Sequence, residues 1–237
     1  MTIESRYREI QGRIQRSCEK SRRGIEEVLL IGVTKTHPPE TVEEGLRLGI
    51  LHLGENKVQE ALAKKNVVGE KGIWHLIGHL QGNKVKNAVQ IFDQIDSVDT
   101  LALAQEISKR CEMIGKRMTV LMEVNVSGEG SKFGVKPEQA ARLAEEINRL
   151  PALELRGLMT MAPLMEDSTK SRPYFAQLRE LRDRIQQETG LHLPELSMGM
   201  SQDFEVAIEE GSTMIRLGTV LFGTRPKPTR EFFEDSI

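Results

Sequence analysis

The sequence predicts an α/β protein of the (β/α)8 class, a TIM barrel built as a single domain with an extra helix at its N-terminus. Eight short apolar runs alternate with segments of helical period along the chain, and such alternation is typical of parallel βαβ units. The chain has 237 residues, close to the usual size of this barrel. The first run is not followed by the Gly-x-Gly-x-x-Gly sequence that would favour a doubly wound open sheet.

The leading helix is predicted over residues 2–23, where Ile3, Ile10 and Ile14 recur at helical spacing among charged residues. The barrel is predicted over residues 28–225, which makes residues 1–237 one domain. We find no linker, low-complexity segment or internal repeat that would divide the chain further.

The eight predicted strands are runs of aliphatic and β-branched residues, which suit the buried strands of a parallel sheet. They are Val28–Val33, Ile50–Leu53, Ile73–Ile77, Gln94–Val98, Met118–Val126, Glu154–Met159, Glu195–Met198 and Met214–Leu217. The helices predicted between them are Pro39–Leu48, Val58–Lys65, Asn83–Val89, Thr100–Met113, Pro137–Leu150, Ser171–Thr189 and Gln202–Glu210. The eighth helix is expected within the tail "TREFFEDSI".

Composition and charge narrow the class of partner. A formal net charge of −2 gives no electrostatic reason to bind nucleic acid or an acidic membrane. No apolar run approaches the roughly 20 residues that span a bilayer, and the charged N-terminus lacks the apolar region of a secretory signal. Cys18 and Cys111 lie far apart in predicted helices, which indicates a reducing compartment. We expect a cytoplasmic protein, and the lack of long apolar surface stripes favours a monomer.

Polar residues and glycines collect where the predicted strands end. Lys35 follows the first strand and Asn56 the second, while the third runs into "IGHLQGNK" and the fifth into "NVSGEGSKFG". The seventh and eighth run into "SMGMS" and "RLGT". In a barrel of this class the active site lies at the C-terminal ends of the strands. The sequence therefore predicts one functional site at that end.

The last two strands predict a phosphate site. Ser201 follows the seventh strand, and Gly218 and Thr219 follow the eighth. The loops after strands seven and eight are the recurrent phosphate site of this fold, and a glycine lets the backbone approach a ligand. The alternative is that Ser201 only caps the next helix. We expect Asp203 and Glu205, in the same turn, to point away from the anion.

Two cations in apolar segments need a physical reason, because a buried charge is costly without a partner. Lys35 is either a polar strand end or a reactive amine, and Arg216 either faces outward or points into the barrel mouth toward a ligand acceptor. A desolvated lysine beside a cation has a lowered pKa and can form a Schiff base. With a phosphate site nearby, this fits a phosphorylated aldehyde, either pyridoxal 5′-phosphate or the substrate of a sugar-phosphate aldolase.

We predict no metal site. His75 and His79 are four residues apart but on a strand and the loop after it, where they are poorly placed to share a metal. No cysteine or carboxylate cluster accompanies them, and His52 and His75 are expected to be core or strand residues. The sequence also lacks the Gly-x-Ser-x-Gly, P-loop and His-Glu-x-x-His motifs.

Four blocks of sequence resemble the pyridoxal phosphate homeostasis protein family, in the same order and spacing. They are "VTKTHPPETVEEGLRLGILHLGENKVQEA", "WHLIGHLQGNKVK", "LRGLMTMAP" and "SMGMSQDFEVAIEEGSTMIRLGTVLFG". Members of this family are barrels similar to the N-terminal domain of bacterial alanine racemase. The resemblance implies that the protein binds pyridoxal 5′-phosphate, delivers it to apo-enzymes and affects amino-acid and keto-acid balance. No turnover is established for the family, so the resemblance implies no catalytic residue.

The resemblance also implies a role for seven residues. Lys35 forms the Schiff base with the cofactor, Asn56 lies beside its ring, and Arg216 faces the pyridine nitrogen. The residues that hold the phosphate are Met200 through its backbone, Ser201, Gly218 and Thr219.

A racemase-like enzyme is the alternative to a carrier. A racemase needs an acid/base group on each face of the bound amino acid, and Lys35 supplies only one. The two tyrosines, Tyr7 and Tyr174, lie in predicted helices, and we expect no second domain after the eighth strand. An arginine at the pyridine nitrogen also weakens the ring as an electron sink, but this leaves both alternatives open, because alanine racemase itself works with an arginine there. We therefore expect a binding and delivery protein without catalytic activity.

Overall fold

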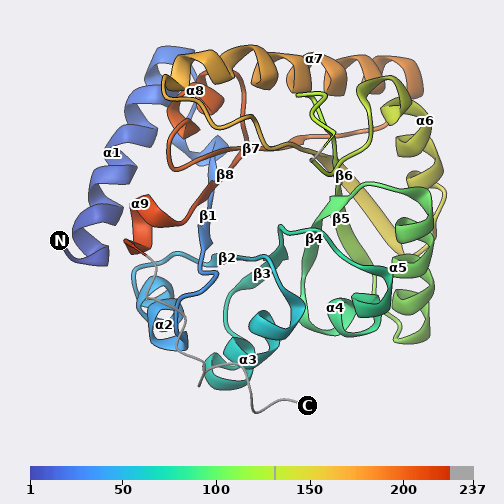
Figure 1. Ribbon diagram of the computed structural model, residues 1–237, viewed down its shortest axis with the longest axis horizontal. Coiled ribbons are helices and arrows are strands. Elements are labelled where there is room, and N and C mark those ends of the chain that lie inside the picture. Colours follow the sequence, from blue (N-terminus) through green and yellow to red (C-terminus); the bar gives the residue numbers. More distant parts are fainter. Residues whose placement is uncertain (131, 225–237) are drawn as a thin grey trace.

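The computed structural model describes residues 1–130 and 132–224 and confirms the predicted fold class. Eight parallel strands pair in their order along the chain, and the last strand pairs with the first to close the barrel. Figure 1 shows the barrel in the middle of the molecule with the helices arranged around it. The first strand meets the last in a continuous register, from Leu29 opposite Met214 to Gly32 opposite Leu217.

Strands and helices alternate as predicted. The strands are β1 (Leu29–Val33), β2 (His52–Glu55), β3 (Ile73–Leu76), β4 (Gln94–Val98), β5 (Met118–Glu123), β6 (Leu153–Met159), β7 (Glu195–Met200) and β8 (Met214–Leu217). The helices are α1 (Ile3–Ser21), α2 (Pro39–Arg47), α3 (Val58–Val68), α4 (Val85–Ile91), α5 (Leu101–Met113), α6 (Pro137–Asn148), α7 (Arg172–Thr189), α8 (Phe204–Glu209) and α9 (Thr219–Phe222).

Several predicted strand boundaries were wrong by one to three residues, and two of them have a clear local reason. The second strand begins at His52, because the Ile50 N–H donates to the Gly45 carbonyl and so belongs to the end of α2. The fifth strand stops at Glu123, because Val124 makes only an isolated bridge with Val135.

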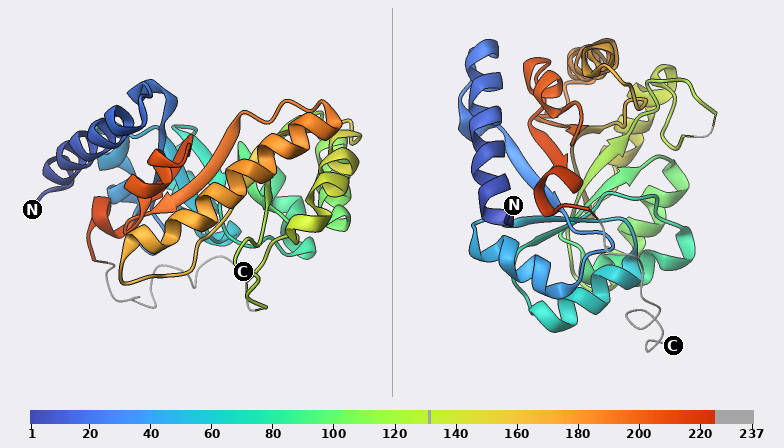
Figure 2. Two further views of the ribbon diagram at one scale, coloured as in Figure 1. Left: turned by 90° about the horizontal axis from the view of Figure 1, so that it is seen from above. Right: turned by 60° about the vertical axis from the view of Figure 1, so that its left-hand side comes forward.

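The leading helix α1 covers the barrel beside its last strand. It lies alongside α8 and α9 in Figure 1 and in the right-hand view of Figure 2. Its buried Ile10, Ile14 and Cys18 belong to one apolar cluster with Ile215 and Leu217 of β8. The short α9 follows β8, and the helix expected within "TREFFEDSI" lies outside the described residues. Thus α1 supplies packing to the wall that β8 and β1 form.

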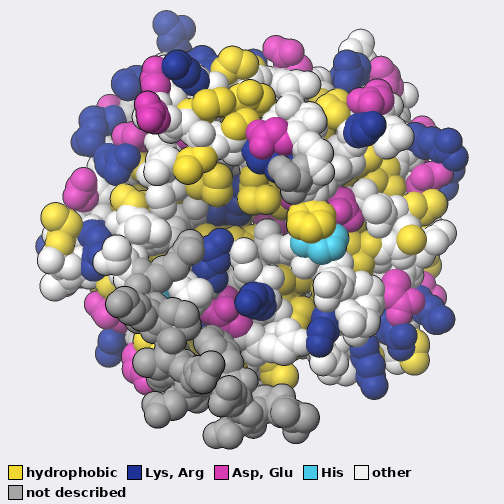
Figure 3. Space-filling model, viewed as in Figure 1, with side chains coloured by type: hydrophobic (Ala, Val, Ile, Leu, Met, Phe, Trp, Pro, Cys, Tyr) yellow, Lys and Arg dark blue, Asp and Glu magenta, His cyan; other side chains and the backbone are white. Residues whose placement is uncertain are grey.

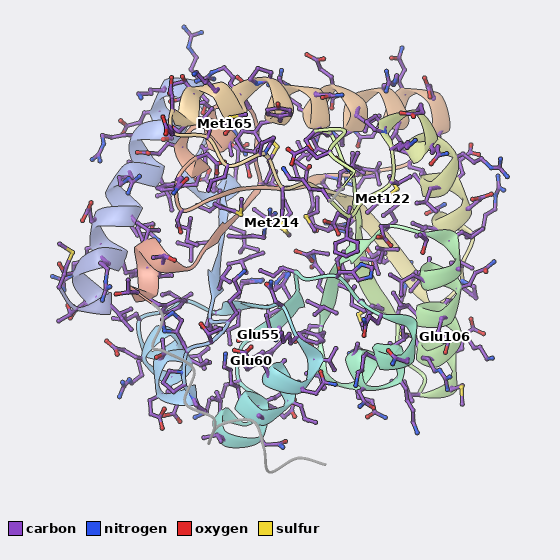
Figure 4. All side chains as sticks on the ribbon, viewed as in Figure 1. Glu55, Glu60, Glu106, Met122, Met165 and Met214 are labelled. Atoms are coloured by element: carbon purple, nitrogen blue, oxygen red, sulfur yellow. The ribbon has the colours of Figure 1, made fainter. Side chains whose placement is uncertain are left out.

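The barrel and its helices hold an apolar core that leaves polar groups near the strand ends. The barrel interior contains a small apolar cluster of Ile31, Leu121, Met159 and Met214. Figure 4 labels Met214 near the middle of the barrel. No described helix is long and apolar enough to cross a membrane.

Candidate cofactor-binding cavity

A cavity of about 410 Å³ opens at the C-terminal ends of the strands. This volume lies in the range of small-molecule sites. The cavity is lined by all seven residues that the sequence singled out, namely Lys35, Asn56, Met200, Ser201, Arg216, Gly218 and Thr219. On the face shown in Figure 3, Lys and Arg side chains surface near the centre, and a histidine lies directly against a hydrophobic side chain.

Lys35 reaches the cavity from the turn that follows β1. Thr34 continues the strand by donating its N–H to the Gly54 carbonyl at 3.1 Å, and the His37 N–H returns to the Thr34 carbonyl at 2.9 Å. Between them Thr36 has a φ of 65°, a left-handed conformation that is uncommon for a β-branched residue. Lys35 is half-buried. The tight turn therefore presents the lysine at the cavity wall.

Arg216 points into the barrel, so the outward-facing alternative was wrong. Its Nη1 donates to the Ser197 hydroxyl at 2.7 Å and its Nη2 to the Thr160 carbonyl at 2.8 Å. The side chain is only 4% exposed. Burial lowers the pKa of the guanidinium, and the carboxylates of Asp96 and Glu123 oppose that shift. Two fixed acceptors leave the remaining donors of Arg216 for the cavity.

Glu123 is a buried acid near Arg216 that the sequence analysis did not single out. Burial raises the pKa of its carboxyl to about 7, the Asp99 charge adds to the rise, and the Arg216 cation opposes it. A glutamate inside an apolar strand is a signal that sequence reasoning could have used, because such a group needs a partner.

Ser201, Gly218 and Thr219, the residues of the predicted phosphate site, all line the cavity. The Ser201 hydroxyl accepts from the Val220 N–H at 3.4 Å, so it contacts the start of α9. A Cβ added at Gly218 would lie 3.3 Å from the Val33 carbonyl oxygen, which shows that glycine permits a close approach of β8 to β1.

The capping alternative for Ser201 was wrong, because Asp203 occupies the N-cap position of α8. Asp203 accepts from the Met200 N–H at 2.7 Å and also lines the cavity, which corrects the expectation that it points away. Burial raises the pKa of its carboxyl. Glu205 does point away, since it accepts from Arg13 of α1 at 2.8 Å.

Asn56 reaches the cavity from the turn after β2, next to Gly78 of the turn after β3. A Cβ added at Gly78 would lie 2.5 Å from the Asn56 carbonyl oxygen and 2.8 Å from its Cα. The absence of a side chain at Gly78 therefore allows these two turns to touch.

An aromatic pair forms another part of the cavity wall. The His79 ring stacks on Phe133 with ring centres 3.8 Å apart and planes 9° from parallel. His79 Nδ1 lies 3.7 Å from Asp99 Oδ2. Asn125 folds the loop that carries Phe133 by donating its Nδ2 to the Glu129 carbonyl at 2.9 Å. The sequence predicts that His79 follows the third strand, but no sequence pattern indicates that it stacks on Phe133.

Within residues 1–130 and 132–224, no three His, Cys, Asp or Glu side chains lie together in a way that could hold a metal ion. His75 and His79 occupy different places, the first fully buried in the barrel and the second at the cavity. His75 Nε2 instead lies 2.9 Å from His52 Nδ1, and burial lowers the pKa of His52 to about 4. This is the strand and core placement that the sequence predicts for both residues.

The fold and the position of the cavity define a class of barrel. The family model of the alanine racemase N-terminal domain matches residues 11–226. An alanine racemase of Clostridium difficile is similar to this chain in fold, with a TM-score of 0.72 at 16% identity, over 94% of this chain and 59% of the racemase chain.

Relatives at higher identity define a narrower group. The pyridoxal phosphate homeostasis protein of Aquifex aeolicus is 48% identical over 90% of this chain and 94% of its own length. The protein of that name from Escherichia coli is 35% identical over 92% of this chain and 94% of its own length. The chain therefore belongs to the pyridoxal phosphate homeostasis protein family.

A solved structure agrees with this assignment. PipY of Synechococcus elongatus, determined with pyridoxal phosphate bound, is similar with a TM-score of 0.84 at 35% identity. The similarity covers 94% of this chain and 100% of the PipY chain.

Proposed function

We propose that this protein binds pyridoxal 5′-phosphate in the cavity at the C-terminal ends of its strands and holds it for delivery to other enzymes. The observation that carries the proposal is that one cavity brings together a lysine, a buried guanidinium and two hydroxyls. The structure of a family relative, PipY, was determined with pyridoxal phosphate bound, which supports the choice of ligand.

The donors around the cavity suit this ligand. The hydroxyls of Ser201 and Thr219, with the backbone around Met200 and at Gly218, would hold the phosphate, while the Met200 N–H itself donates to Asp203. Two of the Arg216 N–H groups already donate to Ser197 and Thr160. One of the remaining N–H groups would donate to the pyridine nitrogen. Asn56 would lie beside the ring.

Lys35 would attach the ligand covalently. The cofactor, when bound, supplies an aldehyde that a primary amine can attack and a ring that withdraws electrons from the product. The neutral Lys35 amine is the form that attacks. The covalent bond and the role of each residue are parts of the proposal.

One feature favours a carrier over a racemase-like enzyme. The described residues that line the cavity include no tyrosine, whereas a racemase needs a second acid/base group opposite the lysine. From sequence we also propose that the protein acts in the cytoplasm as a monomer.

Absorbance spectroscopy tests the ligand and its attachment. We expect the purified protein with added pyridoxal phosphate to show the visible band of a lysine Schiff base, and borohydride to fix the ligand on the protein. Lys35→Ala should lose the band, while Lys57→Ala should keep it, since Lys57 is exposed and lies outside the cavity lining. An unchanged band in Lys35→Ala would contradict the assignment of Lys35.

Transfer and exchange experiments test the role. Loaded protein should restore activity to an apo-enzyme that depends on pyridoxal phosphate. Incubation of the loaded protein with single-enantiomer amino acids in deuterated water should leave the α-proton and the chirality intact. Rapid deuterium incorporation would replace the carrier with the racemase-like alternative.

A further inference from the structure

A buried ion triad lies beneath the turn that carries Lys35. Its members are Glu55 at the end of β2 and Glu60 and Lys64 on α3. Lys64 Nζ donates to Glu55 Oε1 at 2.6 Å and to Glu60 Oε1 at 2.8 Å. Figure 4 shows the two glutamates next to each other where β2 and α3 meet. All three side chains are 6% exposed or less.

The buried ion triad holds the backbone on both sides of Lys35. Lys64 Nζ donates to the Thr34 carbonyl at 2.7 Å, and the Thr34 hydroxyl donates to Glu55 Oε1 at 2.6 Å. On the other side, the Thr36 N–H donates to Glu60 Oε1. The residues before and after Lys35 are therefore tied to the same three side chains.

The hydrogen bond to Glu60 is made by Thr36, which has an unfavourable backbone conformation. Thr36 has a φ of 65°, and a non-glycine residue keeps such a conformation only where its surroundings hold it there. The Glu60 carboxylate supplies that constraint directly at the Thr36 N–H. The position of Lys35 therefore depends on the left-handed backbone of Thr36, which the buried Glu60 carboxylate holds in place.

This arrangement is costly for stability alone. Two carboxylates share one ammonium, burial raises the pKa of Glu55, and Glu55 Oε2 has no hydrogen-bond partner in the described part of the chain. Apolar side chains of similar volume commonly stabilise a protein as well as a buried ion pair does. What apolar side chains could not do is bind the Thr34 carbonyl and the Thr36 N–H.

We propose that Glu60 and Lys64 are positioning residues for Lys35, fixing its backbone so that its amine projects into the cavity. This inference rests on the proposed function. Covalent capture forms a C=N bond between Lys35 Nζ and the aldehyde carbon, breaks the C=O bond and releases one water molecule. A fixed amine reaches the carbon more often than one on a loose turn, so positioning raises the rate of capture.

Two ligands separate positioning from general binding. Pyridoxal phosphate has the aldehyde, whereas pyridoxine 5′-phosphate has an alcohol in its place and binds only through non-covalent contacts. We expect Glu60→Leu and Lys64→Met to slow Schiff-base formation at least tenfold, measured by stopped-flow absorbance. Their affinity for pyridoxine 5′-phosphate, measured by calorimetry, should stay within about threefold of the wild type.

A conservative variant supplies the matched control. Glu60→Gln keeps a side-chain oxygen where the Thr36 N–H donates, so its capture rate should stay within about threefold of the wild type. Thr36→Gly provides a second route if the triad variants do not fold. Glycine tolerates this φ but leaves the turn flexible, so we expect slower capture with unchanged pyridoxine 5′-phosphate affinity.

The outcomes distinguish this inference from the proposed function. A wild type that forms no Schiff base would overturn the proposed function itself. A wild type that captures the aldehyde, beside folded Glu60→Leu, Lys64→Met and Thr36→Gly variants that capture it equally fast, would overturn only the positioning role. Equal losses for both ligands would also overturn it, because they would indicate a general distortion of the cavity.

Discussion

Arg216 of β8 donates to the hydroxyl of Ser197 on β7 across 2.7 Å inside the closed barrel. The same guanidinium reaches the Thr160 carbonyl beyond the end of β6 at 2.8 Å. One side chain on the last strand therefore bonds to groups from the two preceding strand segments. This contact fixes the guanidinium at the cavity and also joins the strands.

Replacing Arg216 should cost stability as well as binding. Arg216→Met removes both hydrogen bonds and the cation that faces the buried carboxylates of Asp96 and Glu123. We expect a loss of about 3 kcal/mol in the free energy of unfolding, measured by urea denaturation at pH 7. Arg8→Met is the control, because Arg8 is exposed and pairs with Glu4 at the surface, and it should change stability by less than about 0.5 kcal/mol. Equal effects of both variants would contradict this role.

Glu123 should make stability depend on pH. Burial raises the pKa of its carboxyl to about 7 in the folded protein, from an ordinary value of 4.5. Between these two values the folded state binds a proton that the unfolded state has released, so the contribution of Glu123 to stability falls as pH rises.

The variant Glu123→Gln isolates this effect. We expect its stability relative to the wild type to increase from pH 4.5 to pH 8 by on the order of 3 kcal/mol. Urea denaturation at several pH values measures it, and taking the difference from the wild type removes the contributions of other groups. A difference that stays constant with pH would show that Glu123 titrates normally.

Gly78→Ala should disturb Asn56. The added Cβ would meet the Asn56 backbone at 2.5 Å, and a backbone atom cannot swing aside as a side chain can. We expect a loss of about 1–3 kcal/mol in stability and weaker binding of pyridoxal phosphate. Gly82→Ala is the control, since, apart from its chain neighbours, no described residue has an atom within 4 Å of its added Cβ. Crystal structures of both variants would show whether Asn56 moves.

The stacked pair of His79 and Phe133 should slow ligand release. Phe133 is 50% exposed, so Phe133→Ala should cost less than about 1 kcal/mol of stability. Its removal opens one wall of the cavity, and we expect pyridoxal phosphate to dissociate about three to ten times faster. Dissociation into an excess of apo-enzyme measures this rate. Met113→Ala, which removes an exposed side chain of α5, should leave the rate unchanged.

Much of the fold and part of the cavity followed from order along the chain. Alternating apolar runs and helical segments predict a barrel, and a barrel brings the strand ends together, so Lys35, Asn56 and Ser201 could be assigned to one place. The strand boundaries were less predictable, because they depend on local hydrogen bonds. The start of β2 depends on the Ile50 N–H donating back to α2, and the pattern of apolar residues does not indicate this contact.

The sequence by itself determined the order of strands and helices and which strand each candidate residue follows, because both depend on the spacing of apolar runs within each βα unit. Only the tertiary structure decided their partners. The Glu60 contact with Thr36, the His79 stack on Phe133 and the packing of α1 beside β8 each join segments far apart in the chain. Such contacts exist only once the strands have paired in the barrel, since this pairing sets the distance between side chains that no local pattern relates.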